Sequence, residues 1–83
     1  HMIGANFDRC YRDGDIITPS LRNVQTTVVP PGGSVMVETK CQVPGNLTLI
    51  DHSIFRLDKG AVGYLMVTGP EQPHLYHSTQ APT

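Results

Sequence analysis

The chain has 83 residues, of which 39% are hydrophobic and 16% are charged, and its formal net charge is −1. A chain of this length forms one small domain at most and buries only about 60% of its unfolded surface. The composition excludes a disordered polymer, and the six scattered basic residues offer no binding surface to nucleic acid or to a membrane. No apolar run approaches the roughly 20 residues that a membrane-spanning helix needs.

Short apolar runs separated by glycine and proline turns predict β-strands along most of the chain. The turn signals are Arg12-Asp13-Gly14-Asp15, Pro30-Pro31-Gly32-Gly33 and Pro44-Gly45, where glycines accept positive φ and prolines cannot donate to a ladder. Residues 61–67 are apolar on both faces, which predicts a central strand. Strands are expected at 7–11, 23–29, 34–41, 46–50 and 61–67, with a short extended piece at 16–18.

One helical segment and a tail complete the pattern. Asp51 is predicted as the N-cap of a helix that ends at Lys59, with Gly60 as the C′ residue. From Gly69 onward the prolines and the absence of periodicity predict an extended arm. His74 and His77 lie in this arm and are expected to be solvated.

Two cysteines, Cys10 and Cys41, lack the CxxC spacing of a metal finger. Each lies in an apolar-alternating segment, so two free buried thiols are the favoured interpretation. A disulfide, which an oxidising compartment would allow, remains open. Neither cysteine is followed shortly by histidine and methionine, so no type 1 copper site is expected in this chain.

The segment from Pro44 to Arg56 runs from an alternating strand into a capped turn that carries His52. An imidazole at a stiff strand-to-helix corner is suited to binding a metal together with ligands from a neighbouring surface. This segment, PGNLTLIDHSIFR, together with the His1-x-Ile3-Gly4 pattern, resembles the second cupredoxin domain of copper-containing nitrite reductases. The resemblance implies an all-β fold, a partial cupredoxin-like Greek-key β-sandwich with one short helix.

By this resemblance, residues 1–69 form the C-terminal half of a cupredoxin domain and residues 70–83 an extended proline-containing tail. His52 is then one ligand of the type 2 copper at which nitrite is reduced to nitric oxide. His1 is the proton-relay histidine, and Ile3 is a wall of the nitrite pocket. Gln25 and Thr26 are expected to brace His1 through hydrogen bonds.

The resemblance also implies partners. Two further copper ligands come from another domain of a neighbouring subunit in a periplasmic homotrimer. The chain by itself is expected to be inactive, to expose sheet edges and to associate with other chains rather than to form a compact monomer.

Two alternatives remain open. His1-Met2 has the form of an expression-vector remnant, in which case its match to the family pattern is a coincidence. The whole chain can also be a non-catalytic cupredoxin-derived module that acts in assembly or binds metal weakly. A multicopper oxidase fragment is disfavoured because no His-Cys-His cluster occurs.

Overall fold

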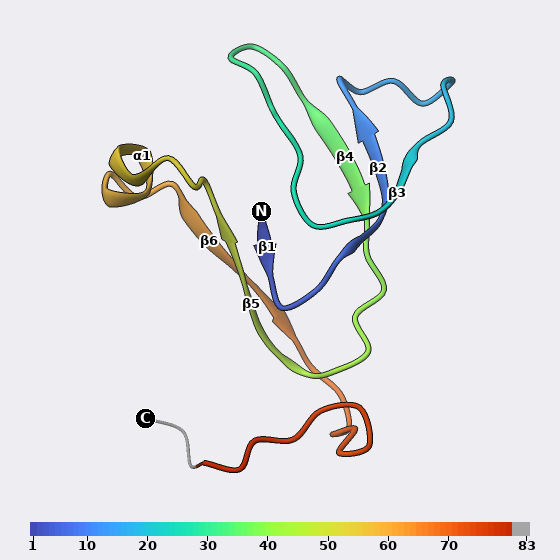
Figure 1. Cartoon of the computed structure of the whole chain (residues 1–83), viewed down its shortest axis with the longest axis vertical. Helices are drawn as coiled ribbons and strands as arrows, with labels where there is room; N and C mark the ends of the chain where they lie inside the picture. The colour runs from blue at the N-terminus through green and yellow to red at the C-terminus, as the bar shows by residue number, and fades with distance from the viewer. Residues whose placement is uncertain (81–83) are drawn as a thin grey trace.

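A computed structural model describes residues 1–80, and these fold into two three-stranded antiparallel sheets. One sheet has the strand order β1-β5-β6 and the other has the order β3-β2-β4 (Figure 1). The elements are β1 (Met2–Ile3), β2 (Phe7–Arg12), β3 (Leu21–Val24), β4 (Val35–Glu38), β5 (Gly45–Ile50), α1 (Ile54–Asp58) and β6 (Val62–Val67). The expected all-β class with one short helix is confirmed.

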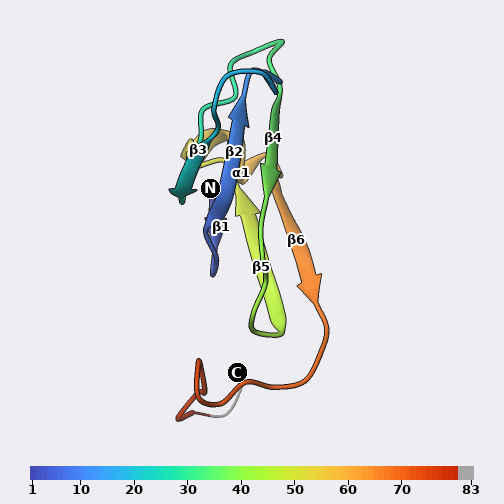
Figure 2. The ribbon, with the colours of Figure 1, turned by 90° about the vertical axis from the view of Figure 1, so that its right-hand side faces the viewer.

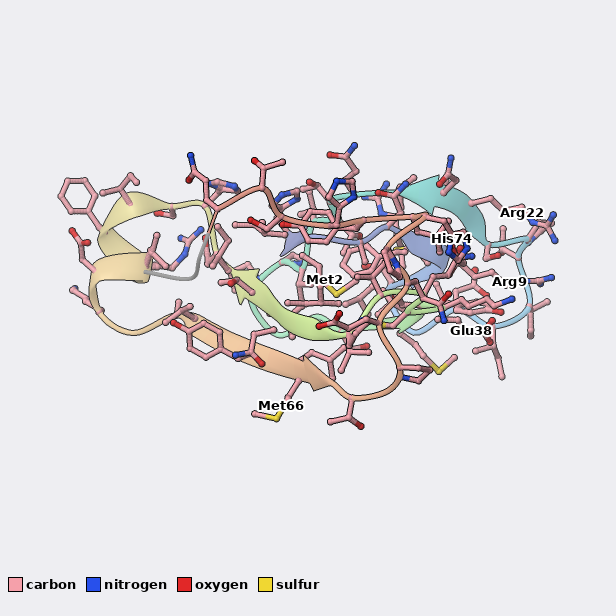
Figure 3. The ribbon with its side chains drawn as sticks, turned by 90° about the horizontal axis from the view of Figure 1, so that it is seen from below. Met2, Arg9, Arg22, Glu38, Met66 and His74 are labelled. Atoms are coloured by element: carbon pink, nitrogen blue, oxygen red, sulfur yellow. The ribbon has the colours of Figure 1, made fainter. Side chains whose placement is uncertain are left out.

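The two sheets meet in a small core. Met2, Phe7 and Cys10 are the buried hydrophobic residues among those described, and Ala5, Val24, Val35 and Leu47 pack against them. Met2 lies inside the ribbon in Figure 3. The chain crosses from β1 to β2 at Gly4, whose φ of +107° favours glycine because side chains disfavour that backbone conformation.

The molecule is flat and wide for its length. Its radius of gyration is 14.7 Å and its extents are 41 × 32 × 16 Å. A compact domain of this length has a radius of gyration of about 12 Å. Figure 2 shows the β3-β2-β4 sheet higher along the long axis than the β1-β5-β6 sheet, with the segment after β6 running below both. The fold therefore leaves much apolar surface uncovered.

Most turn predictions agree with the structure. Asp13 and Gly14 have φ values of +60° and +72°, and the Asp15 N–H donates to the Arg12 carbonyl, which closes the expected turn. Gly60 has φ +101° and follows the C-cap residue Lys59, as a C′ glycine should. Cys10 and Cys41 are both free thiols, the first buried and the second half-buried.

Several strand predictions were wrong. The strand expected at 23–29 is β3, two residues earlier and shorter, because Cys10 pairs with Leu21 and Phe7 pairs with Val24. Residues 16–18 form bends in place of an extended piece, since the Asp15 carboxylate accepts the N–H groups of Ile17 and Thr18. The segment after Gly69 is interrupted by a turn in which Leu75 and Tyr76 donate to the Gln72 carbonyl. Residues 81–83, which include Pro82, lie outside the described residues.

The most informative correction concerns β6. Its two apolar faces predicted a central strand, but it pairs only with β5 and forms the edge of its sheet within residues 1–80. Tyr64 and Met66 are each 71% exposed, and Leu65 is 41% exposed. Met66 points away from the ribbon in Figure 3. An edge strand with neither charge nor proline is a template for pairing with another chain.

We therefore expect the 83-residue chain to associate in solution. Light scattering should give a mass above the 9.1 kDa of one chain. Met66→Lys should lower the measured mass, because a charge on an edge strand opposes pairing. Ile17→Lys is the matched control, since Ile17 is 92% exposed but lies in a bend and not in a strand. A compact monomer of the unaltered chain would contradict this prediction.

The two thiols should differ in reactivity. Cys10 is 1% exposed and Cys41 is half-buried, so a thiol reagent should modify Cys41 quickly and Cys10 only after unfolding. Cys41→Ser should remove the fast phase, and Cys10→Ser should leave it unchanged. Two equally fast thiols would argue against the core described above.

Candidate metal centre

His1 is fixed to the sheet by its backbone. Its amino nitrogen donates to the Ile50 carbonyl at 3.1 Å, and the Ile50 N–H donates back to the His1 carbonyl at 2.9 Å. These bonds extend the β1–β5 ladder, in which Met2 pairs with Leu49 and Ile3 with Thr48. The pairing places His1 beside the end of β5, directly before the loop that carries His52.

The His1 ring reaches across to the segment that follows β3. Its Nδ1 lies 2.9 Å from the Gln25 carbonyl oxygen and 2.9 Å from the Thr26 hydroxyl. A carbonyl can only accept, so Nδ1 is the nitrogen that carries the proton. In the neutral ring Nε2 is then the acceptor, and in the cation it becomes a donor. Gln25 contacts His1 through its backbone, whereas Thr26 does so through its side chain.

His52 lies in the short loop between β5 and α1 and is exposed. Its ring centroid is 5.2 Å from that of His1, and the two ring planes are tilted by 41°. Residues 51 positions apart in sequence therefore place two imidazoles together at one end of the β1-β5-β6 sheet. Figure 1 shows this end of the sheet, with the N-terminus near the strands and α1 beyond the end of β5.

Asp51 is not the helix N-cap that the sequence predicted. The N-cap is Ser53, which makes no side-chain capping bond. The Asp51 carboxylate instead accepts the Ser53 N–H at 2.8 Å and binds Arg56, with Nε 2.6 Å from Oδ2 and Nη2 3.3 Å from Oδ1. The hydrogen bond from Arg56, followed by that from Ser53, lowers the pKa of Asp51, and the same contact raises the pKa of Arg56.

Ile3 is 48% exposed and lines a cavity of about 570 Å³ together with His1 and Gln25. Asn6, Asp8, Lys40 and Cys41 line the same cavity, so its walls are both polar and apolar. His52 does not line it. The cavity is therefore lined by one of the two neighbouring imidazoles, that of His1.

The other histidines lie elsewhere. His74 and His77 are exposed in the segment after β6, where His77 Nδ1 lies 3.2 Å from the Pro73 carbonyl. No group of three or more metal-ligating side chains is found among residues 1–80. The described part of the chain places His52 and His1 next to each other as two neighbouring imidazoles. No helix within this part is long and apolar enough to cross a membrane.

Two antiparallel sheets, one short helix and a histidine pair define a cupredoxin-like fragment. The chain is homologous to a segment of the copper-containing nitrite reductases, which confirms the resemblance inferred from its sequence. It is 50% identical over 76 residues to the enzymes of Neisseria meningitidis and Neisseria gonorrhoeae, and 26% identical over 83 residues to that of Pseudomonas chlororaphis. No protein-family model matches it.

The matched part has a limited extent in the relatives. It covers 90% of this chain but 19% of the Neisseria proteins, so the chain spans about one fifth of their length. In the Pseudomonas protein it covers 99% of this chain and 23% of that protein.

The bond to the Gln25 carbonyl predicts the tautomer of His1. Long-range ¹H–¹⁵N spectra above the titration range should show the proton of neutral His1 on Nδ1. Thr26→Val should keep this tautomer, because the carbonyl remains. His74, which has no ring hydrogen bond to residues 1–80, is the control and should show the tautomer mixture of a solvated imidazole. A proton on Nε2 of His1 would contradict the prediction.

Proposed function

We propose that this chain is part of a copper nitrite reductase, in which it supplies His52 as one ligand of a type 2 copper and His1 as the proton relay. The observation that carries this proposal is the 5.2 Å separation of the two imidazoles at one end of the sheet. The 50% identity to copper-containing nitrite reductases supports it. The short distance between the two rings supports the proposal for the two residues that the sequence resemblance suggests.

The available donors fit copper. Imidazole is a preferred ligand of copper, and the His52 ring is exposed, so a metal held partly by another chain can reach it. Bound copper would pass one electron to nitrite. Two further ligands come from a neighbouring subunit in this proposal, because one imidazole cannot hold the metal tightly.

His1 has the properties that proton delivery requires. Reduction of nitrite to nitric oxide and water consumes two protons and one electron, so a group that titrates near neutrality is suited to the task. Nδ1 of His1 is held by the Gln25 carbonyl and the Thr26 hydroxyl, which leaves Nε2 to take up and release the proton. Thr26 and the Gln25 backbone are positioning groups in this arrangement. Ile3, which follows His1 by two residues, would limit how a small anion binds.

The surface around His52 is suited to a subunit contact. Ile54 and Phe55, the first two residues of α1, lie two and three positions after His52 and are 61% and 79% exposed. Exposed apolar side chains gain free energy when another chain buries them, and these lie close to a proposed metal ligand that needs further ligands from another chain. We propose that this chain is part of one subunit of a homotrimer and meets the neighbouring subunit at this surface. We also propose that the enzyme is located in the periplasm, as the resemblance implies, and serves denitrification.

A chimera tests the proposal. The matched segment of the Neisseria meningitidis enzyme is replaced by this chain, and copper content and nitric oxide production from nitrite are measured. The chimera should hold copper and be active. His52→Ala should remove type 2 copper and activity, whereas His1→Gln should keep the copper and lower the rate by about 100-fold or more.

His74→Ala is the matched control, because His74 is an exposed histidine of the tail and should leave copper and rate unchanged. A chimera in which His52→Ala retains type 2 copper would overturn the assignment. A chimera that folds and assembles but binds no copper at all would favour the non-catalytic module instead.

A further inference from the structure

The loop that carries His52 is closed at its base by backbone bonds. The Asp51 N–H donates to the Ala61 carbonyl at 3.1 Å, and the Ala61 N–H donates to the Arg56 carbonyl at 3.0 Å. These bonds join the end of β5 to the start of β6 around α1. The closed segment runs from Asp51 to Ala61 and carries His52 directly after its first residue.

The His52 ring itself makes no hydrogen bond to residues 1–80, so its position depends on the backbone that carries it. Asp51 and Ser53 flank it, and both are held. The Asp51 carboxylate accepts the Ser53 N–H at 2.8 Å, which bridges the two flanking residues across His52. The Ser53 carbonyl accepts the Leu57 N–H at 2.8 Å and anchors that side to α1.

Arg56 fixes the carboxylate that makes this bridge. Its guanidinium contacts both Asp51 oxygens, at 2.6 Å from Nε and 3.3 Å from Nη2. A two-point contact between planar groups restricts rotation of the carboxylate, which a single-point contact from lysine would not do.

We propose that the Asp51–Arg56 ion pair is a positioning device that sets the direction of the His52 imidazole toward the copper. The proposal rests on the function proposed above and adds two residues that touch neither copper nor nitrite. The observation behind it is that the Asp51 carboxylate binds the Arg56 guanidinium and, at the same time, accepts the N–H of Ser53, the residue after His52.

A purely stabilising role explains this contact poorly. The Arg56 side chain is 68% exposed and that of Asp51 is 36% exposed, and exposed pairs of this kind contribute little to folding stability. Arg9 and Glu38 form a looser surface pair on the other sheet, with a single contact at 3.8 Å (Figure 3). Groups that orient a metal ligand typically change metal affinity or activity by about 10–100-fold when removed.

The experiment uses the same chimeric enzyme. Arg56→Gln and Asp51→Asn should each weaken type 2 copper binding by about 10–100-fold and alter its electron paramagnetic resonance spectrum. The double variant should be no worse than either single variant, because both remove one contact. Arg56→Lys should recover only part of the affinity. Asp58→Asn removes an exposed carboxylate of α1 and is the control that should change nothing.

The outcomes separate this proposal from the function on which it rests. If His52→Ala loses copper while Asp51→Asn and Arg56→Gln keep the affinity and spectrum of the parent, the positioning role is wrong and the function stands. If the variants lower the melting temperature but leave affinity and spectrum unchanged, the pair is merely structural and the proposal is overturned. Should Asp51→Asn fail to fold, the copper affinity and spectrum of Arg56→Lys, which keeps the positive charge, test the positioning role in its place. Unchanged values in that variant would overturn the proposal. If His52→Ala retains copper, the proposed function itself fails.

Discussion

The pairing of the N-terminal residues with β5 is the constraint on which the candidate site depends. Two reciprocal backbone bonds join His1 to Ile50, and the β1–β5 ladder continues through Met2 and Ile3. The same ladder turns Met2 into the core between the sheets. One short strand therefore anchors the hydrophobic packing and brings the His1 ring within 5.2 Å of His52.

The second sheet contributes to the site through the segment that follows β3. Nδ1 of His1 meets the Gln25 carbonyl and the Thr26 hydroxyl, which follow β3. The bond to the carbonyl fixes which nitrogen carries the proton, and both contacts link His1 to the second sheet beside the cavity that His1, Ile3 and Gln25 line. Because backbone carbonyl groups cannot change their role as acceptors, the arrangement holds the tautomer without a charged partner.

The described residues do not bury the apolar side chains of the edge strand β6. Its composition is that of a strand covered on both faces, yet Tyr64 and Met66 are largely exposed. The radius of gyration is larger than that of a compact domain of equal length, which agrees with three buried residues in the described core. The matched Neisseria relatives are about five times as long as the matched segment. Most of their chain therefore lies outside the part that corresponds to this one.

The sequence by itself determined the all-β class, the turns and the kinship with copper-containing nitrite reductases. Gly14, Gly60 and the Pro44–Arg56 segment carry these properties locally, in backbone freedom and in residue order. Only the tertiary structure decided that β6 is an edge, that β3 begins at Leu21 and that Asp51 binds Arg56 in place of capping the helix. Strand order, register and side-chain partners depend on which distant segments meet, and local sequence patterns do not encode that choice. The neighbouring positions of His1 and His52 follow from the same long-range pairing, and periodicity alone could not have placed them together.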